Sequence, residues 1–109
     1  MNGPDKWDAA SLVWERAAEA IGESRRRGWE WRGTPAGSAE PEVLVGRWTT
    51  STHDDVVVIE VLKHPARALG ARFASGDWGK PGTRPLRGPV DGTLDVVLSQ
   101  VLGWPEDVA

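Results

Sequence analysis

Cysteine is absent from this chain of 109 residues. Its absence excludes disulfide bonds, thiolate catalysis and cysteine-ligated zinc, and it is typical of a protein from a reducing compartment. Tyrosine is absent too, and Phe73 is the single phenylalanine. Aromatic packing in this protein therefore depends on tryptophan.

Long apolar runs are also missing. No stretch approaches the roughly 20 apolar residues that a membrane-spanning helix needs. The segment Met1–Asp8 lacks the basic region followed by an apolar region that marks a secretory signal. We therefore expect a cytoplasmic protein that does not act at a membrane.

The chain has no surplus of positive charge. Its 13 basic and 16 acidic residues give a net charge of -3. A general binder of polyanions needs a basic surplus or a strongly segregated basic face, so nucleic acid is a disfavoured partner. The basic residues are mostly arginine and asparagine occurs once, a bias that is typical of a GC-rich bacterial or phage gene.

The overall composition is that of an ordinary globular protein, with 39% hydrophobic and 27% charged residues. The length predicts one domain, residues 1–109, with a single core. The seven tryptophans are unusual. Tryptophan is large and rarely fully buried, so a domain of this size has little room to hide seven of them.

The segment Val56–Leu62 is the most apolar part of the sequence and the richest in β-branched residues. Such a run predicts a strand that is buried on both faces. Glu60 is its one charged residue. We expect a buried acid with a partner such as Arg47 or His64, or else a strand that is half exposed at that point.

Residues Asp5 to Arg27 are predicted to form an amphipathic helix. Asp5, after Pro4, is a suitable N-cap, and Asp8 adds negative charge to the first turn. Arg25–Arg27 oppose the negative end of the helix dipole, and Gly28 follows as the C′ residue. The apolar stripe at helical spacing consists of Trp7, Ala10, Trp14, Ala17, Ala18 and Ile21.

Two strands are predicted between this helix and the central run. Gly28–Gly33 alternates, with Trp29 and Trp31 on one side. Val43–Thr50 is rich in β-branched residues. The polar segment Ser51–Asp55 is predicted to be a turn that joins this strand to the central strand as an antiparallel hairpin.

Residues 65–74 fit two structures. The alanines, Pro65 at the first position and the Leu69/Phe73 pair favour a helix. Alternation of Leu69, Ala71 and Phe73 with Gly70 and Arg72 fits a strand instead. Because alanine and glycine are poor strand formers, helix is the preferred interpretation.

The C-terminal part is predicted to be a long Gly/Pro loop followed by a helix. The loop spans Ser75–Val90, and Asp91 is the expected N-cap of the helix. Gly103 ends the helix, and Trp104 is expected to fold back on the last turn as in a Schellman motif. The helical stripe consists of Leu94, Val97, Leu98, Val101 and Leu102.

Together these elements predict an α+β fold. It has an N-terminal helix, a small antiparallel sheet of three or four strands, and a C-terminal helix packed on one face of the sheet. The opposite face is expected to carry much of the tryptophan, including Trp29, Trp31 and Trp48. An antiparallel sheet covered on one side leaves its other side free for a partner or a second copy.

The Ser75–Val90 loop is the second candidate for an interaction surface. It presents Trp78, Lys80, Arg84 and Arg87 on a segment stiffened by prolines. Tryptophan and arginine dominate the energetics of protein interfaces. The structural alternative is that Trp78 closes the edge of the core and the other side chains are merely solvated.

Two other segments could carry different chemistry. Arg25–Arg32 interleaves basic and aromatic residues, a pattern that can stack bases and hold phosphates, although Glu30 and the net charge oppose this. His53–Asp55 places a histidine beside two carboxylates, which are types used by hydrolases and metal sites. One turn does not supply three or four convergent ligands, so we predict a solvated turn and no metal or cofactor.

The resulting hypothesis is a non-enzymatic binding or adaptor module. Its partner would be another protein or a second copy in a homodimer, bound through the tryptophan-bearing sheet face and the Gly/Pro loop. The alternative is a nucleic-acid-binding protein or small hydrolase that uses Arg25–Arg32 and His53–Asp55.

Overall fold

The computed structural model describes residues 6–105, with side chains from Ser11 onward. It contains two helices, α1 (Lys6–Arg26) and α2 (Leu94–Leu102), at the two ends of the described chain. Between them lie the strands β1 (Glu30–Thr34), β2 (Val43–Thr49), β3 (His53–Glu60), β4 (Arg67–Ala74) and β5 (Arg87–Thr93). The α+β class is confirmed, with five strands where three or four were predicted.

Part of the predicted first helix cannot be compared with the structure. The expected N-cap Asp5 and the side chains of Trp7, Asp8 and Ala10 lie outside the described residues. The end of the helix is as predicted. Gly28 has a φ of +101°, its N–H donates to the Arg25 carbonyl at 3.1 Å, and the Trp29 N–H donates to the Ser24 carbonyl at 3.0 Å. These two bonds form a Schellman motif, which glycine permits because it has no Cβ.

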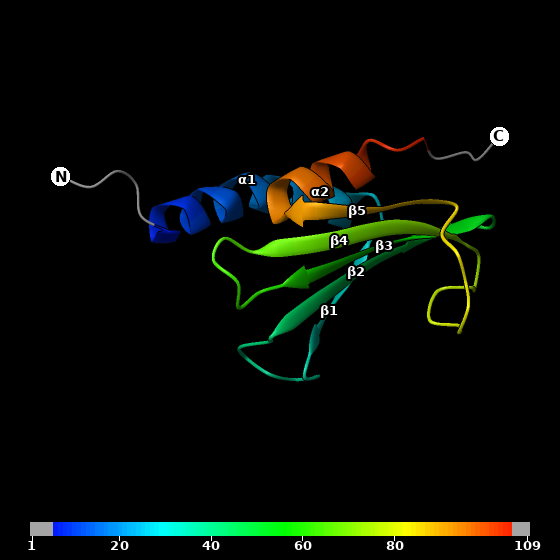
Figure 1. Cartoon of the computed structure of the whole chain (residues 1–109), viewed down its shortest axis with the longest axis horizontal. Coiled ribbons are helices and arrows are strands. Elements are labelled where there is room, and N and C mark those ends of the chain that lie inside the picture. Colours follow the sequence, from blue (N-terminus) through cyan, green and yellow to red (C-terminus); the bar gives the residue numbers. More distant parts are fainter. Residues whose placement is uncertain (1–5, 106–109) are drawn as a thin grey trace.

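The five strands form one antiparallel meander in the order β1-β2-β3-β4-β5 (Figure 1). The central position of β3 is as the valine-rich run predicts, and Val57 and Ile59 on it are fully buried. The strand ends at Glu60, two residues earlier than predicted, and Leu62 lies beyond it and is exposed. Glu60 is not a buried acid. Its carboxylate is half exposed at the strand end and lies 3.0 Å from Lys63 Nζ.

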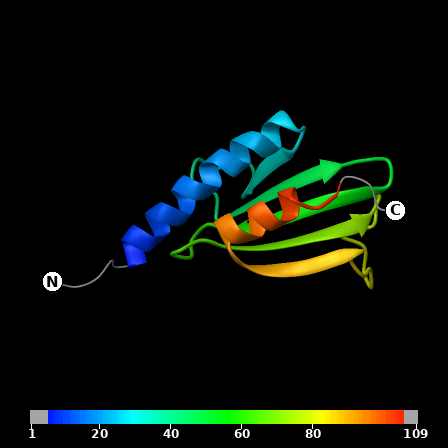
Figure 2. The same cartoon turned by 90° about the horizontal axis from the view of Figure 1, so that it is seen from above.

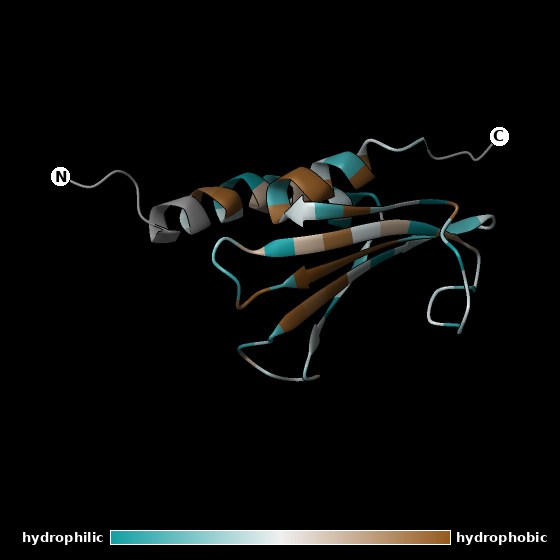
Figure 3. Ribbon diagram, in the orientation of Figure 1, coloured by the Kyte–Doolittle hydropathy of each residue, from teal (hydrophilic) through white to brown (hydrophobic). Residues whose placement is uncertain are grey.

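Both helices lie on the same face of the sheet (Figures 1 and 2). Helix α2 packs on β3, β4 and β5 through Leu94, Val97, Leu98 and Val101, all of which are buried. Gly70 on β4 makes this close approach possible, because a Cβ there would lie 2.5 Å from Val101 Cγ2. Helix α1 packs beside α2 and contacts the sheet through the tryptophans of the following segment. Figure 3 shows apolar residues concentrated in β2, β3 and α2.

Residues 65–74 are the largest error of the sequence interpretation. Arg67–Ala74 form strand β4, and no part of the segment is helical. Alanine and glycine are poor strand formers in isolation, but this strand lies beneath α2, where larger side chains would not fit. Tertiary packing therefore overrides local propensity here.

The predicted turn at Ser51–Asp55 is also wrong. His53, Asp54 and Asp55 belong to β3 and are buried, so the bend between β2 and β3 is shorter than expected. Polar side chains in a strand interior need partners from elsewhere in the chain, and local sequence does not reveal them.

The segment before α2 also differs from the prediction. Arg87–Thr93 is strand β5, so Asp91 lies in a strand and Thr93 occupies the N-cap position of α2. Gly103 ends the helix as predicted, but its φ of -83° is right-handed and no Schellman motif forms. Neither of the described helices is long and apolar enough to cross a bilayer.

Candidate functional site

The sheet has a second face on which no described helix lies. In Figure 1 the helices lie above the sheet and the segment that joins β4 to β5 hangs below one end of it. Side chains alternate along a strand, so the pairing register assigns each residue to a face. We call the face turned away from the helices the open face. Its apolar side chains are Val43, Val45, Val56, Val58, Leu69, Ala71 and Phe73.

The apolar part of the open face is only partly covered. Val56 and Ala71 are buried, whereas Val43, Val45 and Val58 are half-buried. Leu69 is 48% exposed, although it lies in the interior of β4 between two paired strands. The middle of the sheet therefore presents aliphatic side chains to the surroundings.

A groove of about 330 Å³ runs along the β1 side of the open face. Its floor includes Val45, and the ring of Trp78 from the β4–β5 segment forms one wall. Trp78 is 38% exposed. We call this hollow the Trp78 groove, and its lining residues are Glu30, Arg32, Thr34, Val45, Arg47 and Trp78.

The buried carboxylate of Asp54 positions two parts of the Trp78 groove. Asp54 Oδ2 accepts hydrogen bonds from Arg47 Nη2 at 3.0 Å and from the Gly76 N–H at 3.1 Å. The Arg47 guanidinium carbon lies 6.0 Å from the centroid of the Trp78 ring, the distance of a cation–π contact. Asp54 therefore fixes both the arginine in the groove and the start of the segment that carries Trp78.

A different polar network occupies the helix side of the sheet at the same end. Arg72 and Asp55 form a buried bidentate pair, with Nε to Oδ1 at 2.6 Å and Nη2 to Oδ2 at 2.9 Å. Arg72 Nη1 also donates to the Pro105 carbonyl at 2.6 Å. The guanidinium carbons of Arg72 and Arg87 lie 5.7 and 5.8 Å from the centroid of the Trp104 ring. This network attaches the segment after α2 to the sheet.

Three of the predicted binding tryptophans lie on the helix side, so the expectation that the free face carries them is wrong. Trp29 is buried and stacks on Trp31, with ring centroids 6.0 Å apart. Trp31 Nε1 donates to Ser24 Oγ of α1 at 2.9 Å, and Trp48 packs edge-on against His53. These rings cover the core beneath α1.

The binding residues predicted in the Gly/Pro segment do not all lie on one face of the sheet. Trp78 lines the groove on the open face, and Lys80 lies near it, with Nζ 3.6 Å from Asp77 Oδ1. Arg84 is exposed in the same segment. Arg87 belongs to β5 and contacts Trp104 on the helix side. The open face also includes Arg47, Val45 and Leu69. The sequence does not identify these three residues as part of a binding surface.

The residues of the alternative hypothesis do not form a catalytic arrangement. Successive strand residues point to opposite faces, so His53 lies on the helix side and Asp54 on the open side. His53 Nδ1 is 2.9 Å from Thr52 Oγ1, and both oxygens of Asp55 are bonded to Arg72. Among the described side chains, those of residues 11–105, no three metal-ligating groups gather at one place.

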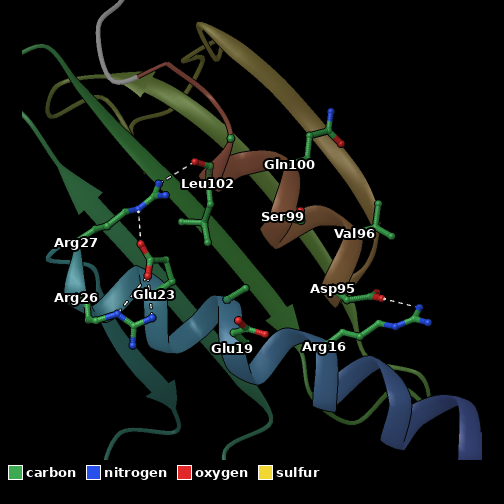
Figure 4. Close-up of a pocket in the computed structure, with 12 residues that line it drawn as sticks. Arg16, Glu19, Glu23, Arg26, Arg27, Asp95, Val96, Ser99, Gln100 and Leu102 are labelled. Atoms are coloured by element: carbon green, nitrogen blue, oxygen red, sulfur yellow. Dashed lines mark hydrogen bonds and ion pairs between the residues drawn. The ribbon is translucent and has the colours of Figure 1, made fainter.

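A second hollow lies between α1 and α2 and has a volume of about 900 Å³ (Figure 4). Arg16 of α1 reaches Asp95 of α2 at 3.7 Å, and Arg27 Nη1 donates to the Leu102 carbonyl at 2.9 Å. Glu23 accepts hydrogen bonds from Arg26 and Arg27, which lower its pKa below the ordinary value of 4.5. Most charged groups here already have partners within the chain, so the hollow offers few free groups to a ligand.

Comparison with models of known protein families, with curated proteins and with solved structures finds no significant match.

Proposed function

We propose that this chain is a non-enzymatic protein-binding domain and that the open face with the Trp78 groove is its binding surface. The observation that carries the proposal is the strip of aliphatic side chains in the middle of the sheet, ending at the partly exposed ring of Trp78. Apolar side chains gathered on one uncovered face are typical of an interaction surface. Tryptophan and arginine at its border are the types that contribute most to binding.

The charges around the strip favour a partner surface with an acidic rim. Arg32 and Arg47 have side chains that are 85% and 44% exposed, and both line the Trp78 groove. Lys80 and Arg84 add two cations on the adjoining segment. Complementary charge at the rim orients a partner and raises the rate of association.

The groove is preorganised for such a contact. Asp54 lies beneath it and fixes Arg47 and the Gly76 backbone before any partner arrives. An arginine that is already held in place loses less conformational entropy on binding than a mobile side chain does. Asp54 is thus a positioning residue in this proposal, since it acts through Arg47 and Trp78.

Affinity capture with the purified chain, followed by calorimetry with each purified candidate partner, tests the proposal. Trp78→Ala and Leu69→Ser should each weaken the complex by about tenfold or more, the typical effect of truncating an interface hot spot. Val96→Ser is the matched control, because Val96 is an exposed aliphatic residue of α2, on the helix side. Equal loss in the control, or undiminished binding by both open-face variants, contradicts the proposal.

A further inference from the structure

The two edges of the sheet differ in their ability to accept another strand. Edge strands present unpaired N–H and C=O groups that can pair with a further chain. In β5, Pro89 has no N–H, and the pairing with β4 is irregular between Gly70 and Arg72. Strand β1 contains no proline and pairs regularly with β2 over its whole length. β1 is therefore the edge suited to strand addition.

The hydrogen-bond alternation of the sheet identifies the outward groups of β1. In an antiparallel pair only alternate residues exchange hydrogen bonds. The Val61 N–H donates to the Glu42 carbonyl, so even-numbered residues of β2 bond to β3 and odd-numbered residues bond to β1. In the observed register, even-numbered residues of β1 face β2. The N–H and C=O groups of Trp31 and Gly33 consequently point away from the sheet.

We propose that β1 pairs antiparallel with β1 of a second copy of this chain, about a two-fold axis at Trp31. The outward groups of Trp31 then exchange both hydrogen bonds with those of Trp31 in the second copy. Glu30 lies directly opposite Arg32 of the second copy, and symmetry repeats this pair. Both side chains are on the open face and are highly exposed, and the contact between them within one chain is loose, at 3.9 Å.

The charges of β1 favour the register with the two-fold axis at Trp31 over the register with the axis at Arg32. Shifting the axis to Arg32 also satisfies the outward backbone groups, but it places Arg32 opposite Arg32 of the second copy. Like charges directly opposite one another are destabilising, whereas opposite charges in a cross-strand pair are stabilising. The order Glu30, Trp31, Arg32 is thus complementary to itself only when the axis passes through Trp31.

The half-buried ring of Trp31 fits the same arrangement. It lies on the helix side, anchored to Ser24, and in the dimer it faces its own copy across the axis. Cross-strand aromatic pairs add to sheet stability. The joined sheets would form one continuous surface, with a Trp78 groove on each side of the join, since the groove borders β1. The proposed dimer does not require the proposed function. If both hold, the dimer carries two partner-binding faces.

Light scattering and sedimentation of the full chain over a range of concentrations test the proposal. The wild-type chain should form a dimer. Arg32→Glu and Glu30→Arg should each raise the dissociation constant by about tenfold or more, since two pairs change from attraction to repulsion. The double exchange E30R/R32E restores complementarity and should return the dissociation constant to within about threefold of wild type. Lys63→Glu, at the far end of the open face, is the matched control.

Amide hydrogen exchange gives an independent readout of the same dimer. The Trp31 amide should be protected only at concentrations where the dimer forms, while the amides of Glu30 and Arg32, which face β2, should be protected at all concentrations. A monomer at every concentration, equal effects of Lys63→Glu and Arg32→Glu, or no recovery in the double exchange would each overturn the proposal. None of these outcomes depends on Leu69 or Trp78 binding a different protein.

Discussion

Asp54 and Asp55 are sequence neighbours whose carboxylates serve opposite faces of the sheet. Asp54 holds Arg47 and Gly76 on the open face, and Asp55 holds Arg72 beneath the helices. A buried carboxylate is tolerated only with partners, and each of these has them. In a solvated loop the same two carboxylates would hold neither arginine in place.

The Asp55–Arg72 pair yields a prediction for stability. Asp55→Ala leaves the guanidinium of Arg72 buried without its carboxylate, which should lower the free energy of unfolding by about 3–5 kcal/mol. Urea denaturation measures this change. Asp91→Ala, which removes the exposed pair with Arg67, is the control and should cost less than about 1 kcal/mol. Equal costs for the two variants would show that the buried pair has no special role.

Gly46 yields a second prediction at the residue scale. A Cβ at this position would lie 2.5–2.7 Å from the ring of Trp31, so the ring must move away from Ser24. Gly46→Ala should therefore lower the free energy of unfolding by about 1–3 kcal/mol, as overpacking in cores does. The comparison is Gly92→Ala, where the nearest atom is 3.6 Å away. A thermal midpoint that falls no further for Gly46→Ala than for Gly92→Ala is incompatible with this packing.

At the scale of elements, the C-terminal end of α1 depends on one exposed acid. Glu23 bonds to Arg26 and Arg27 at distances of 2.7–3.3 Å, and Arg27 also reaches the end of α2. These arginines hold the pKa of Glu23 below its ordinary value of 4.5. A lowered carboxyl pKa means that the folded state binds the proton more weakly than the unfolded state does.

The resulting contribution to stability has a defined pH dependence. It is fully present above pH 4.5 and is lost as the pH falls through the lower pKa of the folded state. Glu23→Gln should therefore be less stable than wild type at neutral pH, and the difference should vanish in acid. Urea titrations of both proteins across this range measure the difference. A difference between Glu23→Gln and wild type that stays constant across this pH range would contradict the account.

Helices were easier to predict than strands in this sequence. The apolar spacing and the glycines at 28 and 103 mark both helices, because these signals are local. The stripe predicted for α1 is only partly right, since its Ala18 is exposed and Val13, which it omits, is buried. The strand β4 is not predicted, because its glycine argues against a strand locally. Gly70 is required there by the close contact with Val101 of α2, which is distant in the sequence. A local propensity argument contains no information about that contact.

The candidate site was predictable only in part, because alternation fixes which residues share a face but not which face the helices cover. Trp29 and Trp31 do lie opposite to Glu30 and Arg32, as the pattern predicts. The helices cover the tryptophan side, however, and the charged side is left open. Trp78 was identifiable as a candidate from its position in a Gly/Pro segment. Leu69 was not, since its exposure follows from β4 being a strand.

At the scale of the whole molecule, the two faces of the sheet differ in composition and in coverage. The helix side contains the core, the Asp55–Arg72 network and five of the described tryptophan side chains, Trp14, Trp29, Trp31, Trp48 and Trp104. The open side has an aliphatic strip, a groove and exposed cations. Its β1 border is the strand edge at which a second copy is proposed to join. The central claim is that partners bind to the open face and not to the helices.

The most direct test is a map of methyl chemical shifts in the labelled chain, recorded during titration with its purified partner. The account predicts large shifts for Val45, Val58 and Leu69 on the open face and for the Trp78 indole. Methyl groups of Val97 and Leu98, on the buried side of α2, should shift little. Shifts confined to Val96 and the neighbouring helix surface, with the open-face methyl groups unchanged, would contradict the account.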